Sequence, residues 1–296
     1  MAPEIQDYLT RQQARVEQAL ERLAPPETAC PPSIHRAMRH SLFAGGKRIR
    51  PILCLEAAEA VGNPSAGIET PAAALEMIHT YSLIHDDLPA LDNDDYRRGR
   101  PSCHKVFGEA IAILAGDALL TRAFQVVAEM EGIAADRRIG MVREMAQAAG
   151  TVDGMIGGQV ADLEAEGKPV VEENLRYIHR SKTAALIRAS VAVGAIFAGA
   201  GRIQLDSLRE FGEQIGLAFQ IVDDVLDVVA PTAGLGKTAG KDAQQRKATF
   251  PALYGVEASR QMARDAEQRA IHALALFGGR AARLRELAAV IVERSA

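Results

Sequence analysis

Two short acidic segments hold the side chains in this sequence that are best suited to chemistry. The first contains Asp86, Asp87 and Asp92, and Asp94 and Asp95 follow directly behind. Neighbouring carboxylates repel one another and raise one another's pKa, so this density of negative charge requires a neutralising partner. Hard divalent cations are the usual partner, and Mg²⁺ binds through one or two carboxylates together with the phosphate oxygens of a substrate. Taken alone, such a run is more often a solvated acidic loop.

A second acidic segment, far along the chain, changes that balance. It contains Asp223, Asp224 and Asp227. Asp223 and Asp227 are four positions apart, so on a helix they share one face, while Asp224 is offset by about 100°. Apolar residues surround them and predict a helix that packs into a core, where carboxylates without partners are too costly to keep ionised. Two such segments facing each other predict a cluster of Mg²⁺ ions that holds a diphosphate.

Basic segments elsewhere could bind phosphate groups from other sides. Residues 45–51 (GGKRIRP) form either a cationic loop between helices or an anion site, in which glycine lets backbone N–H groups approach and Lys47 and Arg50 supply charge. The later loop 234–242 lacks the spacing and the preceding strand of a P-loop. The other basic positions that stand out are Arg97, Arg98, Lys182, Lys237 and Lys247. Together these features suit two diphosphates, one held through metal and one held by cations alone.

The elements that must position these side chains read almost entirely as helices, because alanine is abundant and strand-like alternation is rare. Pro89 disfavours helix at Leu88, so the helix that delivers Asp86 and Asp87 should end there and Asp92 should return from a loop. No linker or change of composition divides the chain, which predicts a single all-α domain over residues 1–296. The expected helices span 4–23, 33–43 with Ser33 as N-cap, 52–61, 72–85, 105–130, 137–157, 172–198, 206–229, 256–276 and 280–294.

Composition and charge exclude several classes of protein. The net charge of −4 offers no electrostatic case for binding nucleic acid. The three cysteines are widely spaced and odd in number, which indicates a reducing, cytoplasmic setting. The N-terminal residues show no signal pattern, and the most apolar stretch, 184–200, is interrupted by Arg188 and falls short of a membrane span.

The motifs resemble those of one known family. Residues 82–99 (SLIHDDLPALDNDDYRRG) resemble the first aspartate-rich motif of the trans-isoprenyl diphosphate synthases, in the form found in bacterial farnesyl diphosphate synthases. Further segments resemble the family's other motifs in the same order, and the resemblance spans roughly residues 40–255. These segments are 45–51, 157–162 (GGQVAD), 182–183, 219–227 and 236–237.

That resemblance implies a bundle of about ten or more helices around a central cavity, the isoprenoid synthase type I fold, and usually a homodimer. It implies three Mg²⁺ ions, with Mn²⁺ as a substitute, bound by Asp86, Asp92, Asp223 and Asp227 with Asp87 and Asp224 nearby. The positions that match the isopentenyl diphosphate site are Gly46, Lys47, Arg50, His79 and Arg98. The positions that match the allylic diphosphate site are Arg97, Lys182, Thr183, Gln220, Lys237 and Lys247, and the resemblance implies that Thr183 and Gln220 face the reacting carbons.

The function implied is condensation of allylic diphosphates with isopentenyl diphosphate, with farnesyl diphosphate as the main product. Tyr81 and Ser82 lie five and four positions before Asp86, where the resembling family sets chain length: an aromatic residue goes with the fifteen-carbon product. A geranyl or geranylgeranyl diphosphate synthase of the same family is the nearest alternative. A class I terpene cyclase, an HD-type metal phosphohydrolase suggested by His79 and His85, and a non-catalytic partner subunit are more distant ones.

Overall fold

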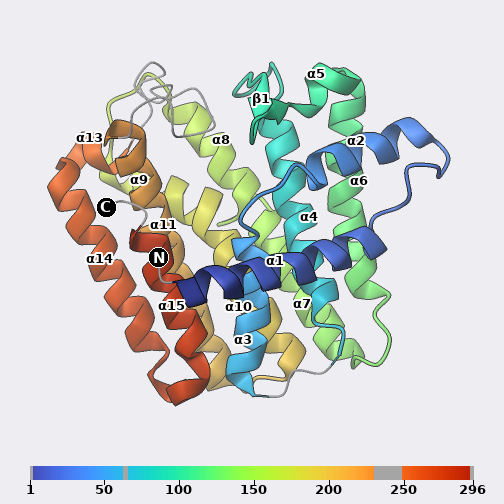
Figure 1. Ribbon diagram of the computed structural model, residues 1–296. Helices are drawn as coiled ribbons and strands as arrows, with labels where there is room; N and C mark the ends of the chain where they lie inside the picture. The colour runs from blue at the N-terminus through green and yellow to red at the C-terminus, as the bar shows by residue number, and fades with distance from the viewer. Residues whose placement is uncertain (1–2, 63–65, 230–248, 294–296) are drawn as a thin grey trace.

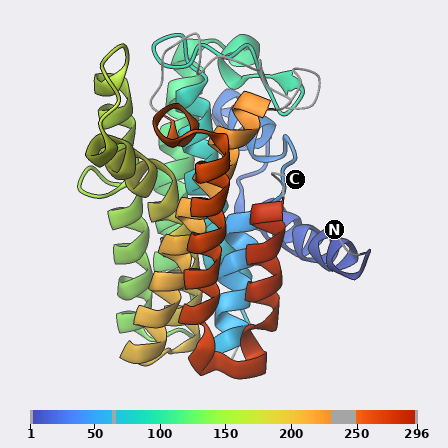
Figure 2. The ribbon, with the colours of Figure 1, turned by 90° about the vertical axis from the view of Figure 1, so that its left-hand side faces the viewer.

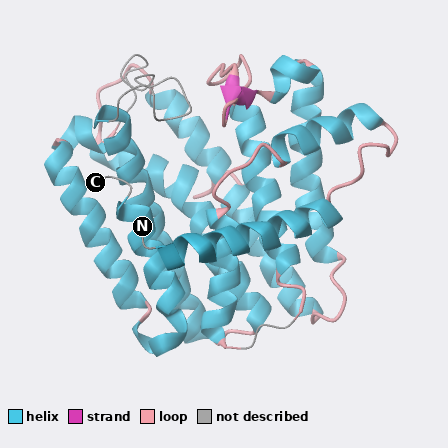
Figure 3. Ribbon diagram, in the orientation of Figure 1, coloured by secondary structure: helices cyan, strands magenta, loops and turns pink. Residues whose placement is uncertain are grey.

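Helices account for nearly all of the chain that the structure, a computed structural model, describes, namely residues 3–62, 66–229 and 249–293. One short antiparallel hairpin, drawn in magenta in Figure 3, joins β1 (Tyr96–Arg97) to β2 (Arg100–Pro101). The all-α fold class expected from the sequence is therefore confirmed. The described helices are α1 Pro3–Leu23, α2 Pro32–Leu42, α3 Ile49–Val61, α4 Glu69–Asp86, α5 Cys103–Phe107, α6 Glu109–Ala128, α7 Ala135–Ala149, α8 Met155–Ala165, α9 Glu172–Ile178, α10 Ala185–Ala198, α11 Arg202–Val229, α13 Phe250–Tyr254, α14 Val256–Ala273 and α15 Ala282–Val292, with a π-helical segment η1 at His179–Ala184 and a 3-10 segment η2 at Ala275–Ala281.

The long helices run side by side along one direction, as the view in Figure 2 shows. Helix α10 lies inside this bundle and packs against α3, α7 and α11. Its side chains are buried on every face, and Val191, Val193 and Phe197 have no exposed surface. An element that is apolar all round is stable in water only when neighbours cover it. The apolar run of α10 is therefore the core of the bundle.

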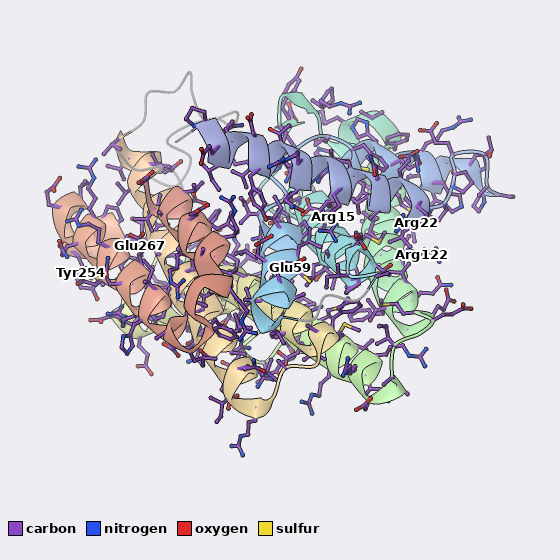
Figure 4. All side chains as sticks on the ribbon, turned by 60° about the horizontal axis from the view of Figure 1, so that its bottom comes forward. Arg15, Arg22, Glu59, Arg122, Tyr254 and Glu267 are labelled. Atoms are coloured by element: carbon purple, nitrogen blue, oxygen red, sulfur yellow. The ribbon has the colours of Figure 1, made fainter. Side chains whose placement is uncertain are left out.

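Helix α1 crosses the bundle on the outside instead of joining it (Figure 1). Val16 and Leu20 on its apolar face are fully buried. Two polar contacts hold the C-terminal half of α1. Arg15 pairs with Glu69 at the start of α4, and Arg122 of α6 donates a hydrogen bond to the Leu23 carbonyl at 3.0 Å. Figure 4 shows Arg15 on α1 and Arg122 beneath its end. The N-terminal helix thus bridges α6 and α4, and α4 carries site residues.

Several expected boundaries were wrong. The helix expected over 105–130 is two helices, because Gly108 interrupts it with φ of 83°. The helix expected over 137–157 ends at Ala149, and α8 begins at Met155. Ser33 is not an N-cap, because α2 begins at Pro32 with Pro31 before it. Proline suits the first turn of a helix, where no intrahelical N–H bond is lost.

Two helical stretches, Glu109–Ala128 and Glu172–Ala198, are long and apolar enough to cross a membrane by length and composition. The second contains the run that the sequence analysis judged too short. Its most apolar window is 78% buried inside the fold, against 39% for Glu109–Ala128. The second stretch is accounted for by the protein core, whereas α6 keeps an exposed apolar face.

Candidate active site

Helices α4, α8 and α11 and the segment η1 line a cavity of about 570 Å³. One part of its wall is polar and charged, and another is apolar, formed by side chains such as Met155, Val160 and Phe219. The lining residues are Arg50, His79, Tyr81, Ser82, Leu83, His85, Asp86, Leu91, Arg97, Arg98, Met155, Ile156, Gln159, Val160, Leu163, Lys182, Thr183, Phe219, Gln220 and Asp223. Residues from both acidic segments and both motif regions between them meet at this one cavity.

The first aspartate of each acidic segment lines the cavity. Asp86 ends α4 and Asp223 lies on α11. Burial raises the pKa of Asp86, the charge of Lys182 opposes this, and the charge of Asp92 adds to it. Asp92 and Asp227, both half-buried, are not among the cavity-lining residues that the structure describes, although the Asp92 amide donates to the Asp86 carbonyl at 2.8 Å.

The carboxylates at the cavity can be tested for their fit to Mg²⁺. Within residues 3–62, 66–229 and 249–293, no group of three or more His, Cys, Asp or Glu side chains is close enough to enclose a metal ion. Asp86 and Asp223 nevertheless line one cavity, and burial raises the pKa of Asp86, an effect that a nearby cation would oppose. Mg²⁺ usually needs only one or two protein carboxylates when substrate phosphate completes its shell. The carboxylates therefore fit a metal that arrives with a diphosphate.

The second aspartate of the first segment faces the protein. Asp87 is 3% exposed and accepts a hydrogen bond from Arg97 Nε at 2.9 Å, and Arg97 also contacts Asp94 at 3.3 Å. Arg97 follows the acidic loop at the start of the hairpin and reaches back to the cavity wall. Charge-assisted bonds to a planar guanidinium fix its direction as well as its position. Asp87 therefore positions a cavity-lining cation.

The second aspartate of the other segment is also turned away from the cavity. Asp224 is 4% exposed and accepts a hydrogen bond from Gln220 Nε2 at 2.9 Å. The Gln220 carbonyl oxygen accepts one from Thr183 Oγ1 at 2.6 Å. Gln220 and Thr183 both line the cavity, so the structure brings together two residues that the sequence predicted for the allylic site.

Lys182 and Thr183 lie in the π-helical segment η1, which interrupts the long helix just before its apolar core part. π-Helical turns are rare and are frequent at functional sites. Helix α8 approaches this segment closely at Gly158, where an added Cβ would stand 2.3 Å from the Lys182 amide nitrogen. Lys182 Nζ then bonds Asp162 of α8 at 2.7 Å. The 157–162 motif thus supplies a glycine for the contact and a carboxylate that directs Lys182.

Arg50, His79 and Arg98 form a second polar cluster on the cavity wall. Burial, followed by the charge of Arg50, holds the pKa of His79 well below its usual range, so the imidazole is neutral. Arg50 Nε is buried and has no hydrogen-bond partner among the described residues. A buried guanidinium nitrogen without an acceptor is costly. The cluster is therefore suited to an anion that would supply the missing acceptor.

The two glycines of the 45–51 segment contact Arg98. An added Cβ at Gly46 would lie 2.4 Å from Arg98 Nη1, and Arg98 donates to the Gly45 carbonyl. Gly46 also has φ of 128°, which side-chain-bearing residues rarely adopt. Segment 45–51 therefore packs against Arg98 and is hydrogen-bonded to it. Lys47 is exposed and is not one of the described cavity-lining residues.

Tyr81 and Ser82 both line the cavity from α4. Tyr81 is 4% exposed, and its hydroxyl is buried without a hydrogen-bond partner among the described residues. Its ring meets His85 edge-on, with ring centres 5.7 Å apart. His85 is itself held at 3.0 Å from the Ile113 carbonyl of α6. The predicted loop cations Lys237 and Lys247 lie outside the described residues.

Sequence reasoning missed two charged residues that support the site, one buried and one half-buried. Arg48 looks like a third basic residue of the 45–51 segment, but it is 2% exposed and bonds Glu17 of α1 at 2.7 Å and Glu76 of α4 at 2.6 Å. Its φ of 51° is strained for any residue except glycine. Asp162, the partner of Lys182, is the other. A usable signal for Asp162 existed, since it ends the quoted 157–162 motif.

Comparison with known proteins gives a consistent result. The sequence profile described as "Polyprenyl synthetase" matches residues 31–275. The chain is 50% identical over 254 residues to the farnesyl diphosphate synthase of Escherichia coli, covering 85% of each, and 47% identical over 277 residues to the chloroplastic geranylgeranyl pyrophosphate synthase of Capsicum annuum, covering 93% of this chain and 74% of that one. The solved structure of an FPP/GFPP synthase from Zymomonas mobilis matches with a TM-score of 0.87 and 34% identity, covering 99% of this chain and all of the other.

Proposed function

Since this chain belongs to the polyprenyl synthetase family and is a prenyltransferase, we propose that it is a Mg²⁺-dependent farnesyl diphosphate synthase. It would join dimethylallyl or geranyl diphosphate to isopentenyl diphosphate by ionisation, condensation and elimination. The observation that carries the proposal is the meeting of Asp86 and Asp223 with the Arg50–His79–Arg98 cluster at one cavity that also has an apolar wall. Two diphosphates and a hydrocarbon chain require that combination.

The residues divide into two groups by what they would bind. Arg50, Arg98 and neutral His79 bind isopentenyl diphosphate, with Lys47 and Gly46 contributing from the same loop. Arg97, Lys182 and the loop cations Lys237 and Lys247 bind the allylic diphosphate. Asp86, Asp92, Asp223 and Asp227 hold the Mg²⁺ ions, three by analogy with the family. When bound, the metal neutralises charge on the departing diphosphate.

The protein's own contribution to the reaction is preorganised charge in a cavity that also has an apolar wall. Arg97 and Lys182 are fixed by Asp87 and Asp162 before any substrate arrives, so they need not reorganise while negative charge develops on the leaving group. The apolar wall keeps water from the allylic cation. The released diphosphate would then accept the proton, because among the described lining residues His79 is assigned to isopentenyl diphosphate and Asp86 and Asp223 are assigned to metal.

Purified full-length protein incubated with isopentenyl and geranyl diphosphate tests this activity. We expect farnesyl diphosphate to form in the presence of Mg²⁺. Its formation should stop when EDTA is added and resume with excess Mg²⁺ or with Mn²⁺. Release of inorganic phosphate without condensation would favour a phosphohydrolase, and a cyclic hydrocarbon would favour a terpene cyclase. Either outcome would overturn the proposal.

The fifteen-carbon product rests on Tyr81. A hydrocarbon anchored at Asp86 and Asp223 would grow along α4 past Ser82 to the phenol ring, which burial and His85 hold in place. Relatives at similar identity carry the names of farnesyl and geranylgeranyl synthases, so their names do not distinguish the two product lengths, and the proposal depends on the residue that lines the cavity. Tyr81→Ala should add twenty-carbon product, measured by chromatography after dephosphorylation. Tyr177→Ala, a tyrosine of α9 outside this cavity, is the matched control; an unchanged profile in Tyr81→Ala would place the floor elsewhere.

We also propose that residues 1–296 form one domain and that the protein is a cytoplasmic homodimer. Exposed apolar residues occur on α5 and α6, two helices that pack against each other, namely Val106 at 48%, Ile113 at 44% and Leu114 at 53%. Covering such a face with a second copy removes apolar surface from water. Light scattering should give a dimer, and Leu114→Glu should give monomers. A monomeric wild-type protein at micromolar concentration would overturn this part.

A further inference from the structure

A chain of hydrogen bonds runs from a buried histidine, which the function above does not use, to the wall of the cavity. His179 Nε2 lies 3.0 Å from Asp224 Oδ2, Gln220 Nε2 donates to Asp224 Oδ1 at 2.9 Å, and Thr183 Oγ1 donates to Gln220 Oε1 at 2.6 Å. His179 and Asp224 are 5% and 4% exposed. At the other end of the chain, Thr183 and Gln220 line the cavity.

The spacing of these residues explains how they meet. His179 and Thr183 are four positions apart in η1, and Gln220 and Asp224 are four positions apart on α11. Each pair therefore lies on one side of its own element. The two elements pack against each other, so that the first residue of one pair meets the last of the other.

The direction of each bond follows from Asp224. Its Oδ2 atom also accepts the backbone N–H of Phe250 at 3.0 Å, and a backbone N–H can only donate. A carboxylate accepts at both oxygens, so the group of Gln220 that faces Oδ1 must be its NH₂. The Gln220 carbonyl oxygen then faces Thr183 and takes the single proton of the hydroxyl. The oxygen of Thr183 is left with only lone pairs to offer to the cavity.

We propose that His179 is a positioning residue that acts through Asp224 and Gln220 to keep the Thr183 hydroxyl an acceptor toward the cavity. This proposal rests on the proposed function and deepens it. A hydroxyl that donated into the cavity would bind diphosphate oxygen, whereas a hydroxyl that only accepts stabilises an electron-poor carbon. The relay thus gives a physical reason for Thr183 to face the allylic carbon, as the family resemblance implies, and leaves the diphosphate to Arg97 and Lys182.

His179 is built into this relay on two sides. Its ring stacks on Phe250 with centres 5.2 Å apart and planes 24° apart, and its Nε2 faces Asp224. The stack and the Phe250 N–H bond hold the same short helix, α13, against the carboxylate. His179→Phe would keep an aromatic ring for the stack and lose only the donor to Asp224. His179→Gln would keep a donor, because its amide can reach where Nε2 does.

Asp224→Asn tests the direction of the relay most sharply. The Phe250 N–H requires an acceptor, so the asparagine oxygen would take the place of Oδ2 and its NH₂ would face Gln220. Gln220 would then turn over, donate to Thr183, and make Thr183 donate into the cavity. We expect kcat to fall at least tenfold with KM for both substrates within about twofold, since one preorganised electrostatic contact is reversed. In a Thr183→Val background the same substitution should cause no further loss.

This double-mutant cycle separates the relay from metal binding. If Asp224 acted by binding Mg²⁺, the losses from Asp224→Asn and Thr183→Val would multiply, and the relay would be overturned. His179→Phe should lower kcat about fivefold to tenfold, and His179→Gln should restore it to within about twofold of the wild type. His272→Phe, at an exposed histidine on α14, is the matched control and should leave kcat unchanged. Equal kcat in His179→Phe and wild type would overturn the proposal.

A measurement that needs no turnover distinguishes failure of the relay from failure of the function. With ¹⁵N-labelled glutamine side chains, the Gln220 amide signal is assigned by its loss in Gln220→Met. We expect a slowly exchanging signal that shifts in His179→Phe and returns in His179→Gln. Wild-type protein that forms no prenyl product would refute the proposed function alone, while an unshifted Gln220 signal in His179→Phe would refute the relay.

Discussion

The two acidic segments have the same pattern and different partners. In each, the first aspartate lines the cavity, Asp86 at the end of α4 and Asp223 on α11, and the second is turned into the protein. Asp87 holds a full positive charge, Arg97, whereas Asp224 receives the neutral donors of Gln220 and Phe250 together with His179. The first segment therefore brings its own cation to the cavity, and the second organises neutral groups around it.

This difference indicates that two adjacent carboxylates can have different roles, one toward a ligand and one toward the protein. Residues next to each other on a helix differ in direction by about 100°, so one can face a ligand while its neighbour faces the protein. At the first segment the inward neighbour places a cation that can bind a leaving diphosphate. At the second the inward neighbour ties η1, α11 and α13 together around Thr183.

The largest expected effect comes from the two cavity-facing aspartates. Asp86→Asn and Asp223→Asn should each reduce kcat/KM by about a thousandfold or more, because charge on the departing diphosphate would no longer be neutralised. Asp95→Asn, at an exposed carboxylate of the same loop, is the control and should be near wild type. Circular dichroism should show unchanged helicity in all three. Normal turnover in either cavity variant would end the proposed equivalence of the two segments.

Replacing the two aspartates that face the protein, Asp87 and Asp224, should lower the stability of the protein by different amounts. Asp87→Asn removes the closer of the two carboxylates that pair with Arg97, which is 12% exposed, so the free energy of unfolding should fall by about 2–3 kcal/mol. Asp224→Asn keeps a neutral acceptor for the Phe250 N–H and should cost about 1 kcal/mol. Urea unfolding followed by circular dichroism measures both. Equal losses would mean that the charged and neutral partners are not the relevant difference.

Replacing the basic residues near the two segments should change KM for different substrates. Arg50→Ala should raise KM for isopentenyl diphosphate about tenfold and leave KM for geranyl diphosphate nearly unchanged, and Lys182→Ala should do the reverse. Steady-state kinetics with one substrate varied at a time gives both values. If each variant weakens both substrates equally, the assignment of two separate diphosphate sites is wrong.

The smallest expected effect concerns Asp162, which holds Lys182 much as Asp87 holds Arg97. Asp162→Asn keeps a hydrogen-bond acceptor for Lys182 but removes the charge, and Lys182 is 24% exposed. We expect KM for geranyl diphosphate to rise about threefold, a value in keeping with a partly exposed ion pair. Glu164→Gln, an exposed position on the same helix, is the control. A larger effect than that of Lys182→Ala would show that Asp162 has another role.

Much of this site could be predicted from residue types and spacing. The apolar periodicity predicted helices, and the helix over 206–229 was found at Arg202–Val229. Pro89 correctly placed the end of α4 at Asp86. Asp86, Asp223, Lys182, Arg50 and Arg98 were selected by residue type, whereas the roles of His79, Thr183 and Gln220 were expected from the family resemblance. All of these residues line one cavity. Local rules suffice here, since each motif lies within a few residues of chain.

What the tertiary structure alone decided is which way neighbouring side chains face. Lys47, Arg48 and Arg50 are equivalent as sequence, yet Lys47 is exposed, Arg50 lines the cavity, and Arg48 is buried between Glu17 and Glu76. His179 carries no local sign of its bond to Asp224. In each case the deciding partner comes from a distant part of the chain. Burying a charge or a polar group is tolerable only where such partners converge, and only the packed helices bring them together.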